Sequence, residues 1–561
     1  MQRLTFVVLC ALVIAPAASG AVVPYPSSQT IFPTGPLPPT TASSVRLNVA
    51  RGETEHAQIV VTGAASVSAR LVAGALEPLA ARLLWAHYVS VGARRVPDAL
   101  VPWSGEQRAT EERNQPLWIE VAVPPETSPG TYEAAVVVSA GGRSTQVPFR
   151  IRVFDVQLPS FRARSGALKA SFFVSAQSYV NKVSQLYGDP SANRSIAAND
   201  SFYRFLAEHR ISPASYGFGE PTSTSGYVTS TRWWLDSTRR MEGLIAAAGG
   251  AFPTMRIPIS SNRAVRAQYV GDLNPYRPET WCRYLGSVHA FWRSHGWMAA
   301  TTPYLFAYDE PGLTRQRLVG RQATAAHRCF PGAQPALTTN PLPGNRRLWD
   351  GRGDDDVDVW VPLARRWYGT FTGHAARTNE RRLFRAISAA RARGKTIWTY
   401  TYTAVPGSPG FAATEPLSNS RMFLLWTALE GTPGVFYTDG VTSYVGGNPL
   451  QSLAQNGQHV LVYPGAAGPV ASARLEQIRD GIEDWSLFDL VRRRLGAGRV
   501  RSILGANGLF SANAARVRLA CVVGCELGGT TKYAWPRWSH DTTTPRRIEQ
   551  AKLDALQLVA K

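Results

Sequence analysis

Between residues 45 and 156, short apolar runs alternate with Gly, Pro and polar turns. These runs lack the 3.6-residue spacing of an amphipathic helix, and short apolar runs bounded by turn residues are typical of β-strands. The predicted strands cover residues 45–49, 56–61, 83–89, 117–123, 132–138 and 147–153. Such a regular series of strands predicts an N-terminal β-sandwich over residues 21–160.

After residue 165 the pattern changes to a strand followed by a helix, repeated along the chain. The strand candidates are residues 168–174, 211–218, 253–257, 304–308, 336–339, 357–361, 396–402 and 434–437. The clearest helices between and after them are residues 202–209, 233–248, 279–295, 313–329, 380–393, 421–429 and 471–495. This alternation predicts an α/β fold, a (β/α)8 barrel over residues 165–500. A doubly wound sheet would give the same alternation, but the strand number and the lack of a Gly-rich phosphate loop favour the barrel.

The two ends of the chain differ from these patterns. Residues 1–20 have the features of a signal peptide, because Arg3 precedes an apolar run over residues 4–15 and small residues follow at 18–20. That run is shorter than the about 20 apolar residues that span a bilayer, and Cys10 lies within it, which argues against a lipid anchor. We therefore expect a secreted, extracellular protein without a membrane span. Residues 501–561 end in an amphipathic helix near 546–559 and are predicted to form a C-terminal cap.

The charge and the aromatic content suggest which partners to expect. The formal net charge is +21, which usually points to nucleic acid. The arginines are scattered, however, with no compact basic run or binding motif, so nucleic acid is not the expected partner. An acidic envelope polymer and a genome rich in Arg codons stay open as explanations. The chain has 16 Trp, 20 Tyr and 21 Phe, which fits the stacking of aromatic faces on sugar rings as well as a hydrophobic core.

Four of the five cysteines lie outside the signal peptide. Cys282 and Cys329 fall on consecutive predicted helices, and Cys521 and Cys525 are close enough to close a small loop. The oxidising environment of a secreted protein would allow both pairs to form. Half a zinc site is the alternative for the second pair, but no further Cys/His pair lies near it in the sequence. We predict two disulfides.

One strand end carries the strongest chemical signal. The fourth predicted barrel strand, residues 304–308, runs directly into Asp309, Glu310 and Pro311. Reactive groups in such barrels project from the C-terminal ends of the strands. Two neighbouring carboxylates repel, which favours a proton on one of them near neutral pH, and glycoside hydrolysis needs such an acid. Capping of the following helix is the alternative role. We predict that Asp309 and Glu310 are catalytic.

Adjacency of the two acids favours one mechanism. Glycosidases with their own nucleophile hold the two carboxyls about 5–5.5 Å apart across the bond, which neighbouring residues can hardly do. In the substrate-assisted route, the 2-acetamido oxygen of the sugar attacks the anomeric carbon instead. Asp309 would then orient this amide, while Glu310 protonates the leaving group.

Other strand ends supply candidate sugar contacts, although aromatic side chains in barrel strands also serve as core. These candidates are Asn340, Trp360, Trp398, Tyr400, Tyr402, Tyr437 and Asp439. The acidic run at 354–356 could bind calcium, but a solvated loop is the simpler interpretation. The histidines are dispersed, and no Gly-x-Ser-x-Gly motif or convincing nucleophilic cysteine is present. We therefore expect no catalytic metal and no cofactor.

Four short segments carry a family resemblance. Residues 461–465 (LVYPG) and 472–485 (SARLEQIRDGIEDW) resemble the terminal signature of domain of unknown function 4091. That domain is similar to the catalytic domain of glycoside hydrolase family 123, the β-N-acetylgalactosaminidases. Residues 50–55 (ARGETE) and 58–61 (QIVV) resemble the start of the N-terminal β-sandwich of that family.

The resemblance implies a sandwich followed by a (β/α)8 barrel, and a substrate-assisted mechanism on an Asp-Glu pair. Asp309 and Glu310 match this pair in residue type, order and strand position. Four charged residues in the segment 472–485 are expected to form ion pairs and caps that hold the last helix to the barrel: Arg479, Asp480, Glu483 and Asp484.

The sequence thus predicts a secreted glycoside hydrolase acting on β-linked N-acetylhexosaminides, with N-acetylgalactosamine favoured. The expected partner is an oligosaccharide or glycoconjugate substrate, and the oligomeric state is left open. Two alternatives stay open. One is a glycosidase on another envelope or plant polymer without acetamido participation, and the other is a non-catalytic glycan-binding surface protein.

Overall fold

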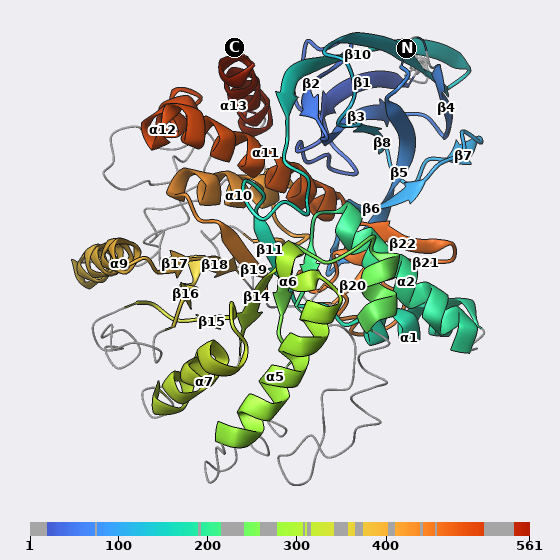
Figure 1. Ribbon diagram of the computed structural model, residues 1–561. Helices are drawn as coiled ribbons and strands as arrows, with labels where there is room; N and C mark the ends of the chain where they lie inside the picture. Colours follow the sequence, from blue (N-terminus) through green and yellow to red (C-terminus); the bar gives the residue numbers. More distant parts are fainter. Residues whose placement is uncertain are drawn as a thin grey trace, which may run out of the picture.

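The computed structural model describes most of the chain after the predicted signal peptide (Figure 1). The described residues are 20–72, 74, 76–188, 192–214, 241–258, 278–306, 309–310, 316–341, 357–364, 374–401, 410–437, 441–454, 457–509 and 543–560. The signal peptide up to residue 19, the acidic run at 354–356, and the cysteines Cys521 and Cys525 lie outside them. The predictions made for these segments therefore stay predictions.

The N-terminal part consists of two mainly antiparallel sheets. The first has the strands β1 (Ala21–Pro26), β3 (Thr54–Thr62), β8 (Asn114–Ala122), β5 (Ala80–Val91) and β6 (Arg94–Pro102), with β20 (Ser452–Leu453) added at β5. The second has β2 (Val45–Arg51), β10 (Arg143–Gln157), β9 (Gly130–Ala140), β4 (Ser66–Val72) and β7 (Arg108–Ala109). All six predicted strands occur here. Below we call these two sheets, without β20, the N-terminal sheets.

Alternating side chains explain why the N-terminal sheets pack together. In β10, Val147, Phe149 and Ile151 are buried, whereas the residues between them are exposed. These side chains share one hydrophobic cluster with Trp85 of β5 and Ile119 of β8, which belong to the other sheet. A period of two with one buried face is the pattern of a strand that covers a core on one side only.

The second part contains two parallel sheets. One has the order β12 (Ser212–Pro213), β11 (Lys169–Phe172), β19 (Gly434–Tyr437) and β18 (Thr399–Thr401). The other has β13 (Thr254–Arg256), β14 (Thr302–Leu305), β15 (Gln334–Leu337), β16 (Val359–Trp360) and β17 (Thr396–Ile397). Because β17 and β18 are consecutive in the chain, the two sheets adjoin and form a curled surface. All the predicted strand positions are occupied, although the observed strands are short.

Helices surround the parallel sheets, as Figure 1 shows. They are α1 (Ala176–Tyr187), α2 (Ala192–Glu208), α5 (Pro278–Ser294), α6 (Trp297–Ala300), α7 (Gln316–Cys329), α9 (His374–Ala392), α10 (Ser418–Glu430), α11 (Ala473–Leu495), α12 (Ala497–Ala506) and α13 (Thr544–Val559). Helix α11 begins where the Ser472 side chain accepts a hydrogen bond from the Leu475 N–H, a common N-cap. Among the described helices, none has the length and apolar content to cross a bilayer.

Side chains from five parallel strands or their ends meet on the concave side of the curled surface. This cluster, which we call the interior cluster, consists of Tyr304, Phe306, Ala336, Val359, Val361, Leu363, Trp398, Tyr400 and Phe436. A much larger cluster joins the other face of the strands to the helices. The interior cluster matters for function because its last side chains lie at the carboxyl ends of the strands.

Buried ion pairs connect α11 to both parts of the molecule. Oδ1 of Asp480 lies 2.8 Å from Nδ1 of His56 in β3. Asp484 binds Nε of Arg421 in α10 at 2.6 Å, and these four side chains are fully buried. The sequence predicted that the charged residues of this helix hold it to the barrel. The structure adds that Asp480 also pairs with the N-terminal sheets.

Helix α13 lies between the N-terminal sheets and the helices of the second part (Figure 1). It packs against β1, β2 and β10 on one side and against α10, α11 and α12 on the other. Nζ of Lys552 lies 2.6 Å from Oε1 of Glu53 and also binds Glu55. The segment predicted as a cap on the barrel therefore fastens both parts of the chain, since Glu549 of the same helix binds Nη1 of Arg421 in α10 at 3.1 Å.

The His56 ion pairs predict an alkaline loss of stability. Burial alone would lower the pKa of His56, but Asp480 and Glu476 outweigh burial and raise it from 6.5 to about 10. A raised pKa in the folded state gives stability that is complete below about pH 6.5 and is lost as the pH rises through about 10. We expect the free energy of unfolding to fall by on the order of 2–4 kcal/mol across this range. Urea unfolding at several pH values would measure it. The same slope in His56→Gln would contradict the assignment.

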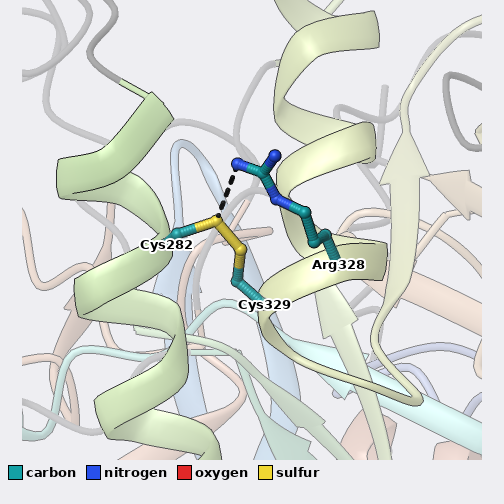
Figure 2. Close-up of a disulfide and its surroundings, with 3 residues drawn as sticks. All are labelled: Cys282, Arg328 and Cys329. Carbon is teal, nitrogen blue, oxygen red and sulfur yellow. Dashed lines mark hydrogen bonds between the residues drawn. A yellow bond between two sulfur atoms is a disulfide. The ribbon is translucent and has the colours of Figure 1, made fainter.

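One of the two predicted disulfides lies among the described residues and is confirmed. Cys282 of α5 and Cys329 of α7 are bonded, with their Cα atoms 5.0 Å apart. Figure 2 shows the bond between the two helices, with Nη2 of Arg328 3.3 Å from Sγ of Cys282. The Cα separation lies inside the usual range for disulfides.

Removing this bond should destabilise the protein. The bridge closes a loop across 47 positions, so it restricts the unfolded chain. We expect the double variant Cys282→Ser, Cys329→Ser to lose about 2–4 kcal/mol of unfolding free energy in denaturant titrations. Peptide mapping without reduction should recover one cross-linked peptide containing both cysteines. Recovery of the two peptides separately would contradict the bond.

Candidate active site

The Asp309–Glu310 pair follows β14 at its carboxyl end. Phe306 is buried in the interior cluster, whereas Asp309 and Glu310 are exposed. The neighbouring strand β15 is parallel to β14, with Leu305 opposite Pro335. The residues that follow these two strands therefore meet at one edge of the sheet, which is where side chains act in folds of this kind. The acid pair is thus exposed to solvent and directly follows a buried strand.

Thr338, directly after β15, contacts both members of the pair. Its hydroxyl oxygen accepts a hydrogen bond from the backbone N–H of Glu310 at 2.9 Å. The same hydroxyl donates to Oδ1 of Asp309 at 2.7 Å. Only 1% of the Thr338 surface is exposed, so these bonds form under the pair and away from bulk water. Thr338 fixes the Asp309 carboxylate and the Glu310 backbone relative to each other.

Tyr400 contacts the other carboxyl group. This residue lies in β18 and packs in the interior cluster, with 4% of its surface exposed. Its hydroxyl donates a hydrogen bond to Oε1 of Glu310. Asp309 and Glu310 therefore have different partners, although they are neighbours in the chain. Different surroundings for two carboxyls are the usual way in which one site obtains two distinct roles.

The backbone of Glu310 has an uncommon conformation. Its φ angle is +39°, which lies in the left-handed region that residues with a Cβ rarely adopt. Such conformations persist where surrounding contacts hold them, and they are frequent at functional sites. The hydrogen bond from its N–H to Thr338 is one such contact.

Arg256 at the end of β13 is a residue that the sequence analysis did not single out. Its guanidinium lies 5.6 Å from the ring centroids of both Phe173 and Phe306. Nη2 donates to the carbonyl of Phe306 at 3.1 Å, and only 3% of the residue is exposed. This cation therefore ties together the ends of strands beside the acid pair. The available signal was one Arg inside an otherwise apolar strand.

Three predicted sugar contacts are buried in the described conformation. Trp360 and Tyr437 are 0% exposed and Trp398 is 1% exposed. Trp398 packs in the interior cluster, and a Cβ at Gly434 would come within 2.4 Å of its indole ring. The Tyr437 hydroxyl donates to the carbonyl of Gln458. These three side chains act as core here, so we leave them out of the proposed site.

The other candidate contacts differ in how they are placed. Asn340 follows Thr338 closely in the chain and is half-buried. Tyr402 and Asp439 lie outside the described residues. Tyr400 is therefore the aromatic candidate with a described contact to the acid pair.

A second cluster of polar groups lies where α11 meets the N-terminal sheets. His56, Glu120 and Glu476 have side-chain atoms within 4.8 Å of one another, a spacing that could hold a metal ion. Nε2 of His56 lies 3.3 Å from Glu476 and 3.5 Å from Glu120. Nη1 of Arg479 lies 3.8 Å from both carboxylates. Because the raised pKa of His56 makes it an imidazolium, charged side chains already balance these carboxylates, and we interpret the cluster as an ion-pair network.

Comparisons with known proteins agree with this architecture. Residues 359–491 match the family model of the glycoside hydrolase 123 catalytic domain. A structure of a family 123 glycoside hydrolase from Clostridium perfringens, described in work on glycolipid glycan hydrolysis, aligns with a TM-score of 0.64 and 11% identity. The alignment covers 97% of this chain and 99% of that chain, so the two share a fold. A glycoside hydrolase family 5 structure from Bacteroides vulgatus matches less well, with a TM-score of 0.35, 10% identity, and 58% and 67% coverage.

No curated protein sequence matches the chain. The family model covers the segment from β16 to α11, which includes β18 with Tyr400 and the charged run of α11. The fold of the family 123 structure extends over the remaining parts, including the N-terminal sheets. The chain is a glycoside hydrolase that resembles family 123.

Proposed function

We propose that this protein is a secreted, retaining glycosidase that cleaves β-linked N-acetylhexosaminides, with N-acetylgalactosamine favoured, by a substrate-assisted mechanism. The observation that carries the proposal is the pair of neighbouring carboxyls held by different partners. Thr338 binds Asp309, and Tyr400 binds Glu310. One exposed strand end thus presents an orienting carboxylate and an acid side by side.

The ordinary double-displacement mechanism fits this arrangement less well. It needs a nucleophilic carboxylate on the opposite side of the glycosidic bond from the acid, with the two groups about 5–5.5 Å apart. Asp309 and Glu310 are consecutive and both follow β14. They therefore approach a bound sugar from one strand end, so the nucleophile has to come from elsewhere. The 2-acetamido oxygen of the substrate supplies it.

The proposed reaction has two steps. In the first, the acetamido oxygen forms a bond to the anomeric carbon while the bond to the leaving oxygen breaks, and Glu310 transfers its proton to that oxygen. Asp309 accepts a hydrogen bond from the amide N–H and stabilises the positive charge that develops on the cyclised amide. In the second, water attacks the anomeric carbon, Glu310 takes back a proton, and the acetamido group is restored. Two inversions at one carbon give net retention.

Two structural parts of the proposal go beyond the described contacts. We propose that the parallel strands close into a complete (β/α)8 barrel, with β12 beside β13, which are in contact. We also propose that the N-terminal sheets form a β-sandwich in front of it. The strand order and the family 123 fold support both.

Export is supported by β1, whose first residue Ala21 directly follows the predicted signal peptide. N-terminal sequencing of protein from the culture medium should begin near residue 21.

A panel of chromogenic β-glycosides tests the function. We expect hydrolysis of the N-acetylgalactosaminide and, more slowly, of the N-acetylglucosaminide, with little turnover of the plain galactoside and glucoside. Equal turnover of acetamido and hydroxyl sugars would favour a glycosidase on another polymer. Glycan binding without any hydrolysis would favour a surface binder.

A further inference from the structure

One hydroxyl group lies under the acid pair and serves both of its members. A threonine hydroxyl has one proton and two lone pairs. The backbone N–H of Glu310 can only donate, so at 2.9 Å it occupies a lone pair of Thr338 Oγ1. The single Thr338 proton is then directed to Oδ1 of Asp309 at 2.7 Å. The direction of both hydrogen bonds is therefore fixed.

This arrangement gives the two carboxylate oxygens of Asp309 different surroundings. Oδ1 accepts the Thr338 proton, and the side chain of Asp309 is otherwise exposed. Oδ2 is therefore the oxygen available to a substrate N–H. Because Thr338 is almost completely buried after β15, its hydroxyl cannot follow solvent motion and sets the rotation of the carboxylate.

We infer that Thr338 is a positioning residue for substrate assistance: its hydroxyl orients Asp309 toward the 2-acetamido group and holds the backbone of Glu310 in its left-handed conformation. The inference rests on the proposed function and assigns a role to a residue outside the acid pair. It predicts that loss of one buried hydroxyl impairs formation of the cyclised intermediate while substrate binding changes little.

The test compares Thr338→Val with Thr338→Ser. Valine keeps the shape but lacks the hydroxyl, and serine keeps the hydroxyl. For acetamido substrates we expect Thr338→Val to lower kcat by about 10–100-fold, the scale on which misplacement of a reacting group acts. KM should change little, and the loss should be similar for good and poor leaving groups. Thr338→Ser should stay within about 3-fold of the wild type, since the hydrogen bonds can be restored.

Thr399→Val is the matched control. Thr399 lies in β18, is also fully buried, and donates its hydroxyl proton to the carbonyl of Pro362 at 2.9 Å. Its replacement removes a buried hydrogen bond from the adjoining parallel sheet without touching the acid pair. We expect this variant to keep its kcat. An equal loss in Thr399→Val would mean that Thr338 acts only through general stability.

A thiazoline mimic of the cyclised sugar gives a second measurement that does not depend on turnover. Its Kd should rise about 10-fold or more in Thr338→Val and stay near the wild-type value in Thr338→Ser and Thr399→Val. A wild type that prefers acetamido substrates, together with an unaffected Thr338→Val, would overturn this inference alone. A wild type with no preference for acetamido substrates would overturn the proposed function and this inference with it.

Discussion

Glu310→Gln should lower the hydrolysis of substrates with poor leaving groups by about 10²–10⁴-fold, the usual contribution of general acid catalysis. Glutamine keeps the size of the side chain and a carbonyl oxygen that can accept the Tyr400 hydrogen bond, but it has no proton to transfer. Aryl glycosides with strongly acidic leaving groups need little protonation, so their rates should fall much less. The measurement is kcat/KM across a series of leaving groups.

The slope of this series is the informative quantity. In the wild type, log kcat/KM should depend weakly on the pKa of the leaving group, because Glu310 protonates the departing oxygen. In Glu310→Gln the dependence should become steep. Tyr400→Phe removes only the partner of the acid and should give an intermediate slope. A uniform loss across the series in Glu310→Gln would contradict its assignment as the acid.

Asp309→Asn should slow good and poor leaving groups alike, by about 10²–10³-fold, the scale on which a group that stabilises developing charge contributes. The reason is that Asp309 is proposed to act on the acetamido group and not on the leaving oxygen. Asparagine is neutral, so it cannot stabilise the positive charge of the cyclised amide. The same variant should bind the thiazoline mimic weakly.

A control separates this role from a loss of structure. The amide oxygen of the asparagine side chain in Asp309→Asn can still accept the Thr338 proton, so the free energy of unfolding should change little. Near wild-type rates in a folded Asp309→Asn would contradict the orienting role. If Asp309→Asn lost activity only on substrates with poor leaving groups, Asp309 would be the general acid and Glu310 the orienting carboxylate.

The sequence predicted many of the strands because each is a short apolar run bounded by turn residues. The predicted ranges lie within or close to β2, β3, β5, β8, β9 and β10; β10 alternates buried and exposed residues, whereas β3 and β8 are buried along almost their whole length. Strands β1, β4 and β6 were not predicted, and neither was β7, whose two residues carry no periodic signal. Helices α1, α6 and α12 were also not predicted; α6 has only four residues, and α12 follows α11 after a single glycine.

The acid pair could be predicted because it combines a chemical signal with a local one. Two adjacent acids at the end of an apolar strand stand out in any strand-and-helix pattern. Thr338 has no such signal, since its relation to Asp309 depends on the register that sets Leu305 opposite Pro335. That register is a tertiary property, so the partner of the pair becomes visible only in three dimensions.

The tryptophans illustrate the opposite problem. Trp360 and Trp398 occupy positions where a sugar contact would be plausible from the sequence, yet both are buried. Trp398 points to the interior cluster, whereas Trp360 belongs to the cluster between strands and helices. Only the register decides which face a strand residue takes. Composition therefore suggested sugar binding without identifying the residues that do it.

The most direct test of substrate assistance changes the nucleophile itself. In a series of aryl β-glycosides whose 2-acetamido methyl group carries zero to three fluorine atoms, each fluorine withdraws electrons from the amide oxygen and weakens it as a nucleophile. The leaving group and the rest of the sugar stay the same. If the acetamido oxygen attacks the anomeric carbon, kcat/KM should fall steeply and steadily along the series, by orders of magnitude from acetyl to trifluoroacetyl. Rates that stay level along the series would contradict substrate assistance by the acetamido group.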